Sequence, residues 1–265
     1  MIDSPLRPDT LFSLAGRVVI VTGATSGMGR VTAEALAAAG AHVVLAGLGD
    51  AEAVAHELAA RGMSAVGVEC DLTVPTAPAA LVADAVSRFG RIDVVFANAG
   101  AAMDAPEDAA HPGTEAALER FDRMVELHVR SVLRLADAAL PVMADGGGGL
   151  FLVMSSLSGL RGNRAIGGYG ITKAANAQLA RNIAVQWGPR GIRANALSPG
   201  VIATDFARPI TDDPDAAPAR LAKTPLGRFG RPEEVAGAVV WLASDAGAFV
   251  SGQNIVIDGG TLAAD

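Results

Sequence analysis

A tyrosine and a lysine four positions apart are the residues of this chain best suited to acid–base chemistry. Tyr169 is the only tyrosine, and its spacing to Lys173 puts both side chains on one face of a helix. A free tyrosine has a pKa of about 10, and a neighbouring ammonium group stabilises the tyrosinate and lowers that pKa. Ser156, at the end of a predicted strand, is a candidate to hydrogen-bond and position the substrate oxygen.

A glycine-rich segment lies between the first predicted strand and the first predicted helix. Its glycines allow a tight turn and close approach to a pyrophosphate, and the helix N-terminus supplies free N–H groups. Taken singly, Tyr169 could be a core aromatic, Lys173 a solvated charge and Ser156 a residue that ends a strand. Together with this loop they favour a catalytic site. The segment is Thr22-Gly23-Ala24-Thr25-Ser26-Gly27-Met28-Gly29.

The elements that must position these residues alternate between β-branched runs and Ala-rich helical stretches. This alternation predicts an α/β fold, a single Rossmann-like doubly wound parallel sheet of about seven strands with helices on both faces. Residues 1–265 form one domain in this interpretation, and residues 202–224 are either a flexible substrate lid or a disordered loop. We expect strands at 18–21, 42–46, 65–68, 92–97, 150–154, 192–197 and 254–257, and helices at 27–39, 51–61, 77–89, 114–143, 169–187 and 232–243.

Composition excludes several classes of function. The net charge of −7, the 4% aromatic content and the lack of a Lys/Arg-rich block speak against nucleic acid and anionic membranes as partners. One cysteine, Cys70, excludes an internal disulfide, and four scattered histidines predict no metal site. The N-terminus has no signal-peptide pattern and no apolar run has membrane-spanning length, so we expect a cytoplasmic protein.

Several motifs in the same order resemble the short-chain dehydrogenase/reductase family over residues 14–260. They are the TGxxxGxG loop, Asn98-Ala99-Gly100, Ser156, the YxxxK pair Tyr169 and Lys173, Ser198-Pro199-Gly200 with Thr204, and the closing segment 251–260. The resemblance implies hydride transfer between a nicotinamide cofactor and a secondary alcohol or ketone. It assigns Tyr169 as acid/base, and Lys173 as its partner and as the residue that holds the nicotinamide ribose. The cofactor-binding residues it implies are Gly23, Thr25, Ser26, Gly27, Met28, Gly29, Gly47, Leu48, Asp71, Leu72, Asn98, Ala99, Gly100, Tyr169, Lys173, Pro199, Gly200, Ile202 and Thr204.

One position departs from the family pattern. Members usually carry an asparagine on the long helix, where it helps to hold a water chain that leads from the lysine to solvent, and here His128 occupies that place. Histidine donates, accepts and titrates near neutral pH, so one hypothesis is that His128 maintains a proton relay as a further catalytic residue. The alternative is that His128 is a packed helix residue.

The second predicted strand ends without either of the usual cofactor-selecting side chains. Gly47 stands at the position where an acid would favour NAD. The positions where an arginine would favour NADP hold Leu48, Thr25 and Ser26 instead. The segment resembles that of bacterial 3-hydroxybutyrate dehydrogenases, which implies NAD, with NADP possible. Ser158 and Ile166 replace two residues of those enzymes, which argues against that particular substrate. Asp71 resembles the acid that contacts adenine, or else caps a turn.

Substrate and assembly stay open at this level. Arg161, Arg164 and Arg208 are candidates to bind an acidic substrate, although loop arginines are more often solvated. The family implies a homo-oligomer, a tetramer or dimer. Two other functions compete with a dehydrogenase. One is an epimerase or dehydratase of the same family, although the short C-terminal part, without a separate substrate domain, argues against the sugar-nucleotide epimerases. The other is a catalytically weak nucleotide-binding or sensing protein on the same fold.

Overall fold

Seven parallel strands form one sheet in the computed structural model, which describes residues 7–103, 108, 111–163 and 167–264. The strand order is β3-β2-β1-β4-β5-β6-β7, so the predicted doubly wound parallel sheet is confirmed. The chain runs outward from β1 to β3, returns to the other side of β1 at β4, and runs outward again. The strands are β1 (Val18–Thr22), β2 (His42–Gly47), β3 (Ser64–Glu69), β4 (Val94–Ala97), β5 (Gly149–Met154), β6 (Ile192–Pro199) and β7 (Asn254–Ile257).

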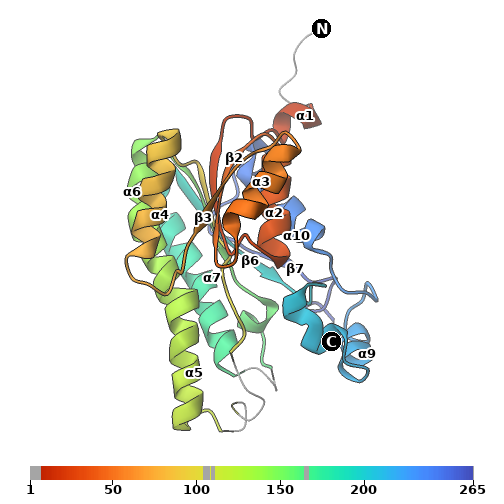
Figure 1. Cartoon of the computed structure of the whole chain (residues 1–265). Coiled ribbons are helices and arrows are strands. Elements are labelled where there is room, and N and C mark those ends of the chain that lie inside the picture. Colours follow the sequence, from red (N-terminus) through yellow and green to blue (C-terminus); the bar gives the residue numbers. More distant parts are fainter. Residues whose placement is uncertain (1–6, 104–107, 109–110, 164–166, 265) are drawn as a thin grey trace.

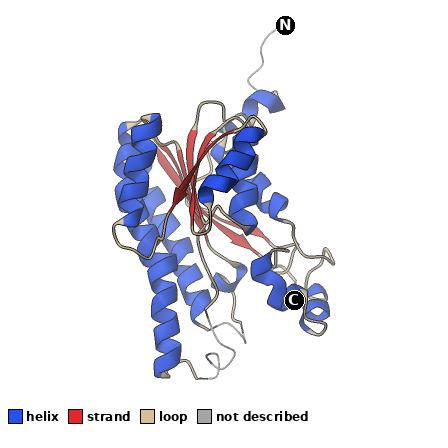
Figure 2. Cartoon of the chain, in the orientation of Figure 1, coloured by secondary structure: helices blue, strands red, loops and turns tan. Residues whose placement is uncertain are grey.

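Helices cover both faces of the sheet (Figures 1 and 2). On one face lie α4 (Ala77–Phe89), α6 (Ser131–Asp145) and α7 (Gly168–Trp187), and on the other lie α2 (Gly27–Ala38), α3 (Ala51–Ala60) and α10 (Pro232–Ala243). Successive strand residues enter opposite cores: Ile20 packs with the first group, and Val19 and Val21 pack with the second. Burial on both faces explains why the strands are apolar without alternation.

Further helical segments complete the chain. They are α1 (Pro8–Leu11), α5 (Glu115–Val125), η3 (Leu157–Gly159), η4 (Gly188–Arg190), η5 (Asp205–Ala207), α8 (Arg208–Thr211), α9 (Ala216–Leu221) and η6 (Asp245–Gly247). Residues 202–224, without a core pattern in sequence, therefore contain three short helices. No described helix is long and apolar enough to cross a membrane.

The long helix predicted at 114–143 is not one regular α-helix. A π-helical segment, η2 (Glu126–Arg130), separates α5 from α6. A π-helical turn adds a residue to the helical repeat, and hydrophobic spacing alone does not reveal it. His128 lies within this segment and is buried. The interruption therefore falls at the position that departs from the family pattern.

Candidate active site

Helix α7 carries both Tyr169 and Lys173 at the carboxyl end of the sheet. Lys173 is 2% exposed, and its Nζ donates a hydrogen bond to the carbonyl oxygen of Met154, the last residue of β5, at 3.0 Å. The same Nζ lies 5.6 Å from the centroid of the Tyr169 ring. Burial lowers the pKa of Lys173 to about 8, because the charged ammonium loses its hydration there. The ammonium is thus held next to the tyrosine by the strand behind it.

The chain between β5 and α7 brings serine and tyrosine together. Ser155 Oγ donates to the Lys173 carbonyl at 2.7 Å, and a Cβ at Gly159 would lie 2.7 Å from the Ala174 nitrogen. Only glycine permits so close an approach to α7. Ser156 Oγ accepts the Ser158 N–H at 3.1 Å and lines one pocket with Tyr169. Two of the predicted catalytic residues therefore share one cavity, and Lys173 lies behind the tyrosine.

The glycine-rich loop forms a cradle beside this pocket. A Cβ on Gly29 would collide with the Gly23 carbonyl oxygen, and a Cβ on Gly23 would lie 2.8 Å from Ala99 Cα. Asn98 Nδ2 donates to the Thr22 carbonyl oxygen at 3.0 Å, and Thr22 Oγ1 accepts the Asn98 N–H at 3.0 Å. The segment after β4 is thus tied to the end of β1. The first turn of α2 then presents its N–H groups at the crevice where the strand order reverses.

Other predicted cofactor residues lie at the ends of β2 and β6 and after β3. Thr25 Oγ1 donates to the Leu48 carbonyl oxygen at 2.7 Å, and a Cβ on Gly47 would lie 3.3 Å from Thr25. Leu72 is buried, whereas Leu48 is 60% exposed. The end of β6 and the segment after it line the pocket together with Met28. The predicted residues there are Pro199, Gly200, Ile202 and Thr204. Ser26 and Gly27 begin α2.

Two acids near the end of β3 have structural partners. Asp71 Oδ1 accepts from the Thr73 hydroxyl at 2.7 Å and from the Thr73 N–H at 2.9 Å, and these bonds lower the pKa of Asp71. This is the turn cap considered as the alternative, and it occupies one carboxylate oxygen only. Glu69, which the sequence did not single out, accepts the Gly49 N–H at 3.1 Å and so shapes the loop after Gly47.

Both ring nitrogens of His128 are occupied. Nε2 accepts a hydrogen bond from the backbone nitrogen of Ala101 at 3.0 Å, and Nδ1 lies 2.9 Å from Thr172 Oγ1. Because the Thr172 hydroxyl donates to the Tyr169 carbonyl at 2.8 Å, Nδ1–H is the donor to it and the imidazole is neutral. Burial, together with the charge of Lys173, lowers the pKa of His128 to about 3. This geometry speaks against the proton-relay hypothesis and favours a residue that ties the loop after β4 to α7.

Within the described part of the chain, the aromatic rings of His128 and Phe206 lie near Tyr169, and the sequence did not indicate Phe206. The His128 ring meets the Tyr169 ring edge-on at 5.6 Å between centroids, and Phe206 of η5 lies tilted at 6.4 Å. Arg220 of α9 also lines the pocket, whereas Arg208 is exposed and pairs with Asp205 at 2.8 Å. Phe206 and Arg220 had no sequence signal because residues 202–224 follow no periodic pattern. Arg164 and Ile166 lie outside the described residues.

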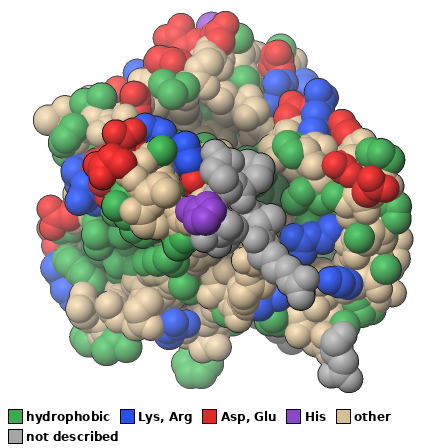
Figure 3. Space-filling view, turned by 90° about the horizontal axis from the view of Figure 1, so that it is seen from below, with side chains coloured by type: hydrophobic (Ala, Val, Ile, Leu, Met, Phe, Trp, Pro, Cys, Tyr) green, Lys and Arg blue, Asp and Glu red, His purple; other side chains and the backbone are tan. Residues whose placement is uncertain are grey.

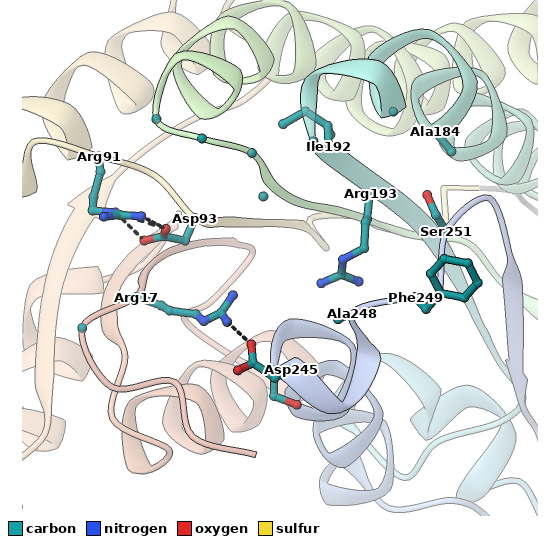
Figure 4. A pocket seen from close by; sticks show the side chains of 18 of the residues that line it. Arg17, Arg91, Asp93, Ala184, Ile192, Arg193, Asp245, Ala248, Phe249 and Ser251 are labelled. Carbon is teal, nitrogen blue, oxygen red and sulfur yellow. Dashed lines mark hydrogen bonds and ion pairs between the residues drawn. The ribbon is translucent and has the colours of Figure 1, made fainter. Parts of the chain in front are cut away.

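A second pocket lies at the amino ends of the strands, opposite the end that carries Tyr169 (Figure 4). Its charged side chains already have partners: Arg91 pairs with Asp93 at 2.5 Å and Arg17 with Asp245 at 2.5 Å. Arg193 donates to backbone carbonyl oxygens, including that of Leu242 at 2.9 Å. These groups serve the structure, so the pocket at Ser156 and Tyr169 is the candidate active site. Among the described residues no group of His, Cys, Asp and Glu has the arrangement of a metal site.

Known proteins resemble this chain over nearly its whole length. A family model described as enoyl-(acyl carrier protein) reductase matches residues 23–261. A cis-4-hydroxycyclohexanecarboxylate dehydrogenase of Sinomonas cyclohexanicum is 39% identical over 249 residues, covering 94% of this chain and 97% of the relative. The 7α-hydroxysteroid dehydrogenase of Escherichia coli K12 is 34% identical over 250 residues, covering 93% of this chain and 94% of the relative.

Solved structures agree with this relationship. A 7α-hydroxysteroid dehydrogenase in complex with NADH and 7-oxo glycochenodeoxycholic acid has a TM-score of 0.89 at 33% identity, covering 96% of this chain and 97% of that one. A gluconate 5-dehydrogenase of Burkholderia cenocepacia in complex with NADP and tartrate has a TM-score of 0.91 at 30% identity, covering 98% and 100%. With this fold, the ordered motifs and these relatives, the chain belongs to the short-chain dehydrogenase/reductase family of oxidoreductases.

Proposed function

We propose that this protein transfers a hydride between a nicotinamide dinucleotide and a secondary alcohol or ketone, with Tyr169 as the acid/base. The observation that carries the proposal is the single pocket shared by Ser156 and Tyr169, with the buried Lys173 ammonium 5.6 Å from the tyrosine ring. A proton donor, a hydrogen-bonding hydroxyl and a fixed positive charge are the protein groups that assist carbonyl reduction by a hydride donor.

The residues at the crevice fit a dinucleotide. Gly23 and Gly29 keep side chains out of the cradle at the start of α2, where free N–H groups and the helix dipole favour a pyrophosphate. When bound, the nicotinamide ring would supply or accept the hydride. Ser156 would hold the substrate oxygen, and Tyr169 would give a proton to that oxygen in reduction and take it back in oxidation. Lys173 would stabilise the tyrosinate and hold the ribose.

NAD is the cofactor we favour over NADP. A 2′-phosphate needs a free cation, and the arginine of α2, Arg30, forms an ion pair with Glu57. The Glu69 carboxylate, which bonds the Gly49 N–H, adds negative charge at the end of β3, beside the loop after Gly47. Both features disfavour the 2′-phosphate of NADP. Relatives in solved complexes carry either NADH or NADP.

A small to medium secondary alcohol or ketone is the proposed substrate class, as the names of the relatives suggest. We expect a cytoplasmic homo-oligomer, a dimer or tetramer. Val185 on α7 is 79% exposed, and Phe249, which precedes β7, is fully exposed. Apolar side chains displayed in this way suit contacts with further copies of the chain.

The first test is a fluorescence titration of the purified protein with NADH and with NADPH. We expect tighter binding of NADH, followed by turnover of alcohols or ketones that Tyr169→Phe abolishes. Tighter binding of NADPH would overturn the cofactor assignment and leave the enzyme proposal standing. Binding without turnover across a broad panel, identical in wild type and Tyr169→Phe, would instead favour the sensing protein.

A further inference from the structure

The pocket in front of Ser156 and Tyr169 has a positively charged wall. Arg161, which follows η3, and Arg220, on α9, both line it and are both partly buried. Neither Asp nor Glu appears among the described residues of the lining. Figure 3 looks onto this end of the molecule, where the surface is hollowed and Lys and Arg side chains stand near the hollow.

Neither guanidinium has an acidic partner among the residues that the structure describes. Arg208 on the adjacent α8 differs from both, because it is exposed and pairs with Asp205. Partly buried guanidinium groups are ordinarily paired, because removal of water from an uncompensated charge is costly. An arginine without an acidic partner at a pocket wall is therefore suited to pair with an anionic group of a bound ligand.

The two guanidinium groups also act on each other. The pKa of Arg220 is lowered, first by burial and second by the positive charge of Arg161. Two cations close enough to repel are unfavourable until an anion lies between them. Guanidinium groups form planar pairs of hydrogen bonds that match a carboxylate.

Apolar side chains line the same pocket. Leu157, Ile202, Phe206 and Ile210 contribute to its lining together with Ser156 and Tyr169. The pocket therefore offers a polar reacting site, apolar surface for a carbon skeleton and a cationic wall.

We propose that Arg161 and Arg220 bind a carboxylate of the substrate, so that the enzyme acts on hydroxy acids and keto acids with an apolar skeleton between the carboxylate and the reacting carbon. This inference rests on the proposed function and narrows its substrate class. It makes Arg220 and Arg161 specificity-determining residues, and it leaves the hydride and proton transfers as described above.

The test compares a charged probe with a neutral one of the same shape. The enzyme saturated with NADH is assayed with 4-oxocyclohexanecarboxylate and with its methyl ester, as wild type, Arg220→Met and Arg161→Met. Arg208→Met is the matched control, because it removes a paired arginine outside the pocket. We expect wild type to prefer the carboxylate, and Arg220→Met to lower kcat/KM for the carboxylate about 10-fold or more while changing the ester less than about 3-fold.

A binding measurement separates this inference from the proposed function. Calorimetry of the NADH complex with cyclohexanecarboxylate and with cyclohexanecarboxamide should show tighter binding of the carboxylate, lost in Arg220→Met and kept in Arg208→Met. Equal binding of the two probes, or binding of neither, would overturn the inference even if ketones are reduced. If Arg220→Met weakens NADH binding and affects acid and ester alike, the guanidinium serves the cofactor and the inference is wrong. Carboxylate binding without reduction of any ketone would instead count against the proposed function alone.

Discussion

Replacement of Lys173 by methionine should strongly lower activity and at the same time stabilise the apoprotein. The Lys173 side chain is 2% exposed, and burial lowers its pKa from the ordinary 10.5 to about 8. At about 1.4 kcal/mol per pKa unit, the buried charge costs on the order of 3 kcal/mol at neutral pH. Methionine keeps an unbranched apolar stem, and the Met154 carbonyl oxygen retains its hydrogen bond from Asn176 Nδ2 at 3.2 Å.

Part of this gain is offset. The hydrogen bond from Lys173 Nζ to Met154 disappears, at a cost of about 1 kcal/mol, and packing around the shorter methionine relaxes. We therefore expect the free energy of unfolding at pH 7 to rise by roughly 1–2 kcal/mol. Activity should fall by about two to four orders of magnitude, because the tyrosinate loses its stabilising charge.

The pH dependence has a definite sign. Below a pH of about 8 Lys173 is charged in both the folded and the unfolded chain, so its burial cost is fully present. As pH rises from about 8 toward 10.5, the folded protein loses the proton first and the cost disappears. The stability advantage of Lys173→Met should therefore shrink over that range.

Urea unfolding followed by circular dichroism, at several pH values from about 7 to 10, measures this difference. The chain's other lysine, Lys223, is exposed, so Lys223→Met is the matched control and should leave both stability and its pH dependence unchanged. A Lys173→Met protein that is less stable than wild type at pH 7 by more than about 1 kcal/mol, with a difference that does not vary with pH, would refute the reasoning.

Three further predictions concern the cradle and the pocket. Gly29→Ala should lower the free energy of unfolding by about 2–4 kcal/mol and weaken NADH binding, because its Cβ would collide with the Gly23 carbonyl oxygen. Gly237→Ala in α10 has open space around it and should raise the free energy of unfolding by about 0.5–1 kcal/mol. Denaturant unfolding compares the two variants, and equal effects would contradict the packing argument. The imidazole NMR signals of His128 should not titrate between about pH 5 and 8, because burial holds the imidazole neutral; a midpoint near 6.5 would revive the relay hypothesis. Ser156→Ala should lower kcat by roughly 10²-fold. Loss of the hydrogen bond from the Ser158 N–H should lower the melting temperature by no more than about 4 °C, and a larger loss of stability would indicate a structural role instead.

Much of the fold followed from local pattern. Strands buried on both faces are apolar without alternation, so the seven strands and the helices between them were visible as compositional runs. The Tyr169–Lys173 spacing places both side chains on one helix face whatever surrounds the helix. The glycines of the phosphate loop were visible for a similar reason, because only glycine tolerates the contact between Gly29 and Gly23.

Contacts between elements distant in the chain decided the rest. Nothing near His128 in sequence shows that Ala101 and Thr172 will occupy both ring nitrogens, so its neutral state depends on how η2, α7 and the loop after β4 meet. The π-helical interruption and the ion pair that occupies Arg30 are likewise products of packing. Arg220 and Arg161 are 59 residues apart in the chain, and only the fold shows that both line the same pocket. Local spacing determines which groups share an element, but burial and charge pairing, which set what those groups can do, depend on the whole tertiary arrangement.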